Sequence, residues 1–171
     1  MLFREDRVRE AIPFLEHAIK LMDSDFHSGD LLLDCYASIG DQDSVRRVAD
    51  LTLPRCEAAL SQDPNNGAAL AAGVAALLAV GEFKRGRQWV QRALALDPDN
   101  ALVLYNLACP LTRHGTDLDL ALELFERHFA RVNSTILLKH VDADPDLDSI
   151  RDHPRFRKML AAAKKRLRVS G

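Results

Sequence analysis

Four aspartates alternate with other residues near the carboxy end of the chain, and this spacing is the first candidate for metal chemistry. They are Asp142, Asp144, Asp146 and Asp148. Alternating carboxylates begin a calcium-binding loop, but such a loop also needs a glycine at its sharp turn and a closing glutamate; Leu147 and His153 occupy those places. We therefore interpret the aspartates as helix caps, with Asp146 or Asp148 before one short helix and Asp152 before the next.

The segment from Gly81 to Gly86 has the glycine spacing of a phosphate-binding loop. Arg87 and Gln88 replace the lysine and the hydroxyl side chain that such a loop needs, and no strand is predicted before it. The three cysteines and six histidines lie scattered, without the spacing of metal ligands or of a nucleophile and its base. The sequence therefore predicts no catalytic residue, no cofactor, no cofactor-binding residue and no metal ligand, and we expect this segment not to be an enzyme.

The amino-acid composition excludes several classes of protein. The 171 residues include 23 basic and 25 acidic side chains, and the formal charge of −2 argues against a nucleic-acid-binding protein. No apolar run reaches the roughly 20 residues that a membrane-spanning helix needs, and the charged amino end differs from a signal peptide, so we expect a cytoplasmic protein. Hydrophobic residues make up 47% of the chain and aromatic residues only 6%, which indicates stacked helices.

The basic side chains are unevenly distributed along the chain. Residues 151–171 carry eight of them and one aspartate, so this stretch has a formal charge of +7 and the preceding 150 residues have −9. One interpretation is a solvated terminal helix whose basic end complements the helix dipole. The other is a patch that binds an acidic partner or an anionic surface.

A repeat is visible in the middle of the chain. The segment 60–66 (Leu-Ser-Gln-Asp-Pro-Asn-Asn) recurs 34 residues later as 94–100 (Leu-Ala-Leu-Asp-Pro-Asp-Asn). Between them, apolar side chains at three- and four-residue spacing predict two amphipathic helices that are separated at Gly81. Small residues such as Gly73 and Gly86 should let these helices approach closely.

This period and its Asp-Pro ending resemble the tetratricopeptide repeat, a pair of helices of about 34 residues. The resemblance implies an all-α, right-handed superhelical solenoid, with helix pairs near 27–61, 67–96 and 101–132. His128 occupies a position where the repeat usually has alanine, so its ring must find a polar partner or open the helix interface. The three predicted repeats are 27–66, 67–100 and 101–134.

Atypical segments flank the three repeats. Residues 1–26 match only the second helix of a repeat, so one apolar face would be uncovered unless a missing part of a longer protein or another copy of the chain covers it. Residues 135–171 form a capping segment, whose amphipathic helix should cover the last repeat through Phe156. Leu147 and Ile150 would anchor the stretch before that helix.

The end of the chain carries a more specific resemblance. Three segments carry it: Tyr105-Asn106-Leu107-Ala108-Cys109, then Asp144-Pro145-Asp146-Leu147-Asp148, then Ile150-Arg151 with Pro154-Arg155-Phe156. Together they resemble the carboxy-terminal repeat region of bacterial class III adenylate or guanylate cyclases, over about residues 10–165. The cyclase catalytic domain has no counterpart here, so the resemblance implies a role in signal transduction but no catalytic residue.

These observations predict a module for protein interaction and regulation, in a multidomain signalling protein such as a nucleotide cyclase that produces cAMP. A free-standing adaptor or scaffold of the same fold is the alternative. The partner should be a protein or peptide, such as an apolar helix or a domain of the parent chain, and a homo-oligomer remains open. We expect partner contacts on the concave face, at Ala68, Ala71, Ala72, Ala75, Ala79, Leu102, Tyr105, Asn106, Cys109 and Arg113.

Overall fold

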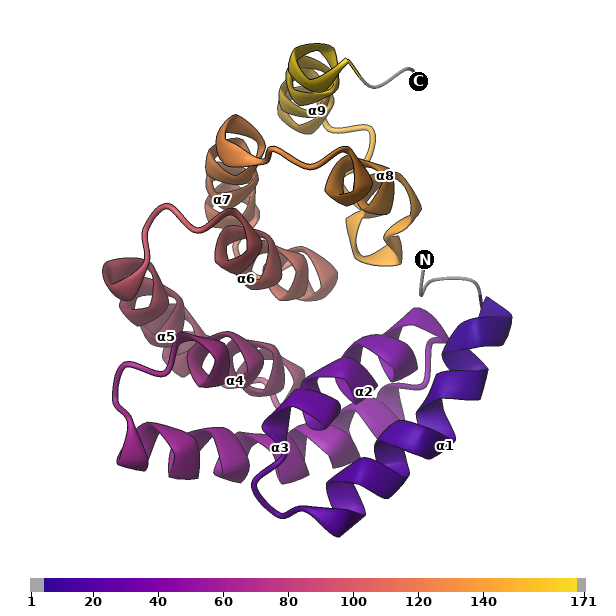
Figure 1. Ribbon diagram of the computed structural model, residues 1–171, viewed down its shortest axis with the longest axis vertical. Coiled ribbons are helices and arrows are strands. Elements are labelled where there is room, and N and C mark those ends of the chain that lie inside the picture. Colours follow the sequence, from indigo (N-terminus) through magenta and orange to yellow (C-terminus); the bar gives the residue numbers. More distant parts are fainter. Residues whose placement is uncertain (1–4, 169–171) are drawn as a thin grey trace. The chain divides into compact units, whose positions relative to one another are not determined.

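The computed structural model describes residues 5–168, and within that range the chain is helical, without any strand (Figure 1). The prediction of an all-α protein is confirmed. The chain divides into two compact units, residues 1–96 and 97–171, which are described separately.

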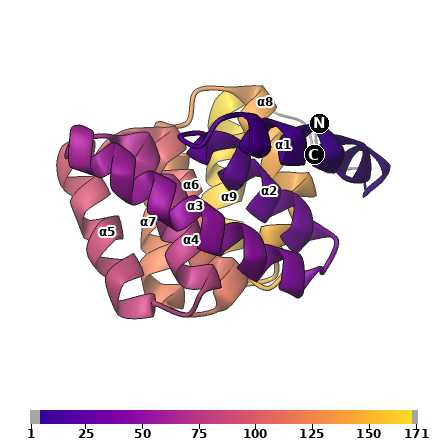
Figure 2. The same cartoon turned by 90° about the horizontal axis from the view of Figure 1, so that it is seen from below.

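The first unit contains five helices in its described part. They are α1 (Glu5–Leu21), α2 (Phe26–Ser38), α3 (Gln42–Gln62), α4 (Gly67–Ala79) and α5 (Phe83–Leu96). Each helix packs against the next along the chain, and α2 also packs against α4; Figure 2 shows α3 beside α2 and α4. The core contains Leu32, Val48 and Leu77, all fully buried.

Side-chain caps begin α3 and α4, and a glycine follows the end of α4. The Asp41 side chain accepts a hydrogen bond from the Ser44 amide at the start of α3, and Asn66 caps α4 in the same way. Gly81 follows α4 with a φ of 83°, a conformation that favours glycine. Gly73 of α4 lies under the Trp89 ring of α5, so the expected close approach of these helices is present.

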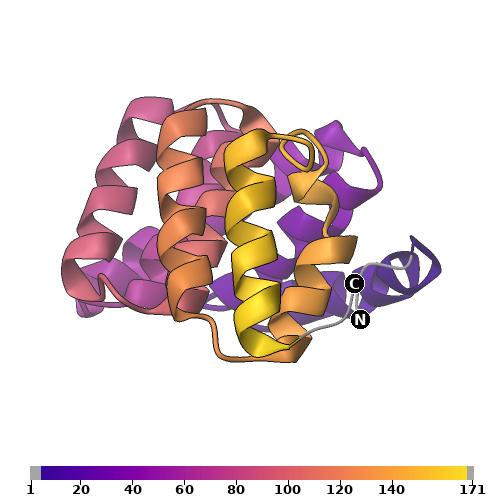
Figure 3. The ribbon, with the colours of Figure 1, turned by 90° about the horizontal axis from the view of Figure 1, so that it is seen from above.

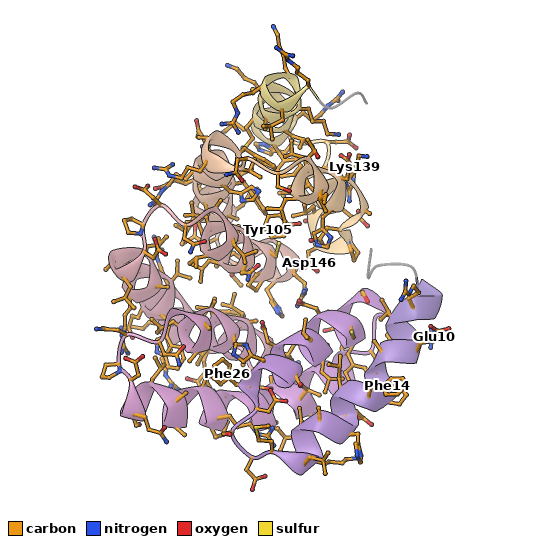
Figure 4. The ribbon with its side chains drawn as sticks, viewed as in Figure 1. Glu10, Phe14, Phe26, Tyr105, Lys139 and Asp146 are labelled. Carbon is orange, nitrogen blue, oxygen red and sulfur yellow. The ribbon has the colours of Figure 1, made fainter. Side chains whose placement is uncertain are left out.

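One face of α1 is exposed. Val8 and Ile19 are buried on the side that packs against α2, whereas Phe14 is 77% and Leu21 is 73% exposed. Figure 4 labels Phe14 on α1. Two large apolar side chains of the predicted partial repeat are therefore accessible, and residues 1–4 of that segment lie outside the described residues.

The second unit contains α6 (Ala101–His114), α7 (Leu118–Arg131), α8 (Thr135–Ala143), a 3₁₀ turn η1 (Pro145–Leu147) and α9 (Pro154–Leu167). Helix α9 packs alongside α7, as Figure 3 shows. Phe156 is fully buried there and makes edge-to-face contacts with Phe125 and Phe129, at centroid distances of 5.4 and 5.6 Å. Leu147 and Ile150 are also buried, as predicted.

Two details of this unit differ from the sequence prediction. Helix α8, which Ser134 caps, was not predicted. The caps are also different: Asp144 caps η1 and His153 caps α9, in place of Asp146, Asp148 and Asp152. Pro154 explains the second difference, because proline favours the first helical position and the residue before it then becomes the cap.

Candidate functional site

The predicted contact residues of α4 range from exposed to buried. Ala68 is exposed, Ala71 and Ala79 are half-buried, and Ala72 and Ala75 are buried. Ala75 belongs to the core that α2, α3 and α4 share. The accessible part of this face therefore consists of Ala68, Ala71 and Ala79, beside α2.

The predicted contact residues of α6 divide into two groups. Leu102 is 55% exposed and Asn106 is exposed. Tyr105, Cys109 and Arg113 instead contact the segment that follows α8, so the chain itself occupies this part of the face. Figure 4 labels Tyr105 on α6 and Asp146 in η1.

A buried hydrogen bond joins α6 to the start of η1. The Tyr105 hydroxyl donates to Oδ2 of Asp144 at 2.5 Å, and both residues are buried. Burial raises the pKa of Tyr105, and the nearby Cys109 and the Asp144 carboxylate raise it further, so the hydroxyl keeps its proton. The other oxygen, Oδ1 of Asp144, accepts a hydrogen bond from the Asp146 amide.

An ion pair forms the second attachment. The Arg113 guanidinium donates to both oxygens of Asp146, at 2.7 and 2.5 Å, and the two side chains are 14% and 11% exposed. Two parallel hydrogen bonds of this kind fix geometry as well as charge. Arg151 holds the segment from the other side, because it donates to the carbonyl oxygens of Val141, Asp142 and Asp144.

These attachments also bear on metal binding. One ligand atom each from Cys109, Asp144 and Asp146 lies within 4.8 Å of the others. However, Tyr105 donates to Asp144, and the cationic Arg113 donates to both oxygens of Asp146. A cation would have to displace a guanidinium from a half-buried ion pair. These contacts therefore suit a structural attachment of the carboxy-terminal segment to α6, here called the lock, better than a metal centre.

The His128 ring of α7 has a polar partner at the interface with α6. Its ring is 2% exposed, and Nδ1 lies 2.7 Å from the Ala101 carbonyl oxygen, so Nδ1 must carry the proton. Within the described residues, Nε2 of His128 and Nε2 of His114 are buried without a hydrogen-bond partner. Burial lowers the pKa of both rings, to about 4 for His114, where the neighbouring Arg113 contributes as well.

Sequence reasoning missed the two attachments for a physical reason. Tyr105 and Asp144 are 39 residues apart, and Arg113 and Asp146 are 33 apart, so no local periodicity connects them. The only signal in the sequence was that Tyr105 and Arg113 place polar groups on a face of α6 that otherwise carries apolar side chains.

No family model and no curated protein matches the chain. A functional assignment therefore has to be argued from the sequence and from the geometry described above. Across the described residues, no helix is both long and apolar enough to cross a membrane. The class that the fold defines is an all-α protein of successively packed helices.

Proposed function

We propose that this chain is a tetratricopeptide-type repeat module that binds a protein segment and thereby regulates the protein to which it belongs. Its successive helices and the 34-residue displacement of the Asp-Pro segment support the repeat assignment. Repeats of this kind present extended surfaces formed by their first helices, which suit binding better than catalysis.

The observation that carries the proposal is the composition of α4. All of its 13 residues are Gly, Ala, Leu or Val, although part of its surface is accessible at Ala68, Ala71 and Ala79. The neighbouring helix α2 exposes 47% of Leu31. Small side chains allow another backbone to approach closely, so this face suits an apolar helix of a partner or of another domain of the parent chain.

The second unit offers a smaller surface for the same purpose. Leu102 and Asn106 of α6 are accessible, whereas Tyr105, Cys109 and Arg113 are in contact with the chain's own carboxy-terminal segment. We therefore place the principal partner surface on α4.

The resemblance to cyclase tails supports a signalling role. A nucleotide cyclase is the parent protein we favour, and a free-standing adaptor is the second candidate. The complete reading frame separates them: a cyclase catalytic domain in the same frame supports the first, and a frame without any effector domain supports the second.

Affinity purification with charge-matched variants tests the binding function. Ala68→Glu with Ala71→Glu places two carboxylates on the α4 face, and Gln88→Glu with Gln91→Glu places two on the exposed surface of α5. A partner recovered by the wild-type chain and the α5 variant, but lost from the α4 variant, supports the proposal. Equal recovery by all three folded proteins contradicts it.

A further inference from the structure

A cleft of about 630 Å³ lies between α7 and α9. Its walls include Glu126 and Ala130 of α7 and Arg155, Lys158, Met159 and Ala162 of α9. Phe156 fills the helix contact next to it. The cleft exists because alanines line it where larger side chains would close the space.

The charges around the cleft are three cations and one carboxylate. Arg166 is held in place, because it donates to the carbonyl oxygens of Phe129, Ala130 and Val132 at the end of α7. Arg155 is half exposed and contacts two exposed carboxylates weakly, Glu126 at 3.4 Å and Asp119 at 3.9 Å. Lys158 is exposed, and no side chain in the described part of the protein pairs with it.

We propose that this cleft binds an acidic peptide segment of a partner protein. One large apolar side chain of the peptide would lie against Met159 and Ala162, and carboxylates on either side would pair with Lys158 and Arg155. Cations above an apolar floor complement such a segment in both charge and hydrophobicity. This surface shares no residue with the α4 face, so it is independent of the proposed function.

The floor and the rim favour a peptide over a nucleic acid. A nucleic-acid surface relies on several cations that contact phosphates, and its salt dependence reflects their number. Here Glu126 places a carboxylate among the cations, and Ala130, Met159 and Ala162 provide an apolar surface that a phosphate backbone does not use.

Methyl NMR of the full chain with labelled methionine can locate the binding. The probe is a short peptide with a central Leu-Phe pair flanked by Asp and Glu, and its controls are the same peptide with Lys at the acidic positions and an oligouridine RNA. Met159 lines the cleft, whereas Met22 lies in the other unit. The acidic peptide should shift the Met159 resonance saturably and leave that of Met22 unchanged.

Three variants of α9 complete the experiment. Lys158→Glu should weaken binding about tenfold or more, because it replaces an attraction by a repulsion. Ala162→Phe should block the cleft. Arg157→Glu, at an exposed position that does not line the cleft, should weaken binding less than Lys158→Glu does, because its side chain makes no contact with the peptide and its charge acts only through solvent.

Several results would overturn the proposal. They are the absence of saturable binding at millimolar peptide, equal weakening by Arg157→Glu and Lys158→Glu, or tighter binding of the RNA or the lysine peptide. Unchanged thermal unfolding of each variant ensures that a loss of binding reports on the cleft.

Discussion

Helices α4 and α6 are the first helices of two predicted repeats, and the faces on which we predict partner contacts differ between them. Helix α4 contains only Gly, Ala, Leu and Val, and it packs against α2 while part of its alanine surface remains accessible. Helix α6 carries Tyr105 and Arg113 on this face, and both bind the carboxy-terminal segment of the chain.

The difference shows how side-chain type determines what can cover a helix face. A buried hydroxyl or guanidinium is costly unless a hydrogen-bond partner satisfies it, so Tyr105 and Arg113 require a particular acidic segment. Alanine side chains have no polar group to satisfy, so in the proposed function they would accept any closely fitting apolar surface. The α6 face is thus covered by one particular segment of the chain, whereas the α4 face is partly accessible and carries no polar group that would select its partner.

The largest effect should come from the aromatic contact that holds α9 on α7. Phe156→Ala removes a fully buried ring and should destabilise the second unit by about 3 to 5 kcal/mol. Phe14→Ala, at a site 77% exposed on α1, is the matched control and should have little effect. Urea unfolding measures both, and similar losses would show that α9 is not anchored through Phe156.

Breaking the ion pair on α6 tests whether that face is a lock. Arg113→Met leaves the Asp146 carboxylate mostly buried without its cation, and it should cost about 2 to 3 kcal/mol. Arg131→Met, which removes an exposed ion pair with Asp99, should cost less than about 1 kcal/mol. Hydrogen exchange should accelerate in residues 135–151 for the first variant alone; unchanged exchange there would contradict the lock.

The part of the fold that could be predicted is the part that residues close together in the sequence determine. The bounds of α4 and α5 follow from three-and-four spacing, the Asn66 cap and the positive φ of Gly81, all of which act within a few residues. Helix α8 was missed because it is short and because Lys139 and His140 interrupt its apolar pattern.

The candidate site could be predicted only in part. Helical spacing places Tyr105, Cys109 and Arg113 on one face of α6, but their occupant depends on contacts across more than 30 residues. Side-chain burial likewise depends on neighbouring helices, which is why Ala72 and Ala75 are buried while Ala68 is exposed. Periodicity identifies a face, and tertiary packing decides what covers it.

The accessible alanine face of α4 depends on close packing between α4 and α5 on the other side of the helix. An added Cβ at Gly73 would lie 2.1 Å from the Trp89 ring, so Gly73→Ala should destabilise the first unit by about 1 to 3 kcal/mol through overpacking. Gly67 of the same helix has open space around it, and Gly67→Ala should be neutral or stabilise by up to about 1 kcal/mol. Thermal unfolding distinguishes them, and equal effects would mean that Trp89 moves aside without cost.

Mild acid should weaken the second unit more than the first. His114 and His128 lie in the second unit with pKa values that burial lowers, whereas His17 and His27 in the first unit are exposed. A base with a lowered folded-state pKa stabilises the fold above its unfolded value of about 6.5, because below that pH the unfolded chain takes up the proton first. For His114, with a folded pKa of about 4, the loss between pH 7 and pH 5.5 should be about 1 kcal/mol.

Hydrogen exchange at the two pH values, corrected for the intrinsic pH dependence of exchange, measures this loss in residues 97–168 against residues 7–96. His114→Gln should remove about 1 kcal/mol of the loss in the second unit, since glutamine does not titrate. The part of the loss that is due to His128 should stay, and the first unit should be unchanged. The window lies above the pH at which carboxylates such as Asp41 and Glu16, whose pKa values are lowered by their hydrogen bonds, begin to take up protons. An equal loss in both units, or a loss of undiminished size in the variant, would show that the buried His114 ring is not its cause.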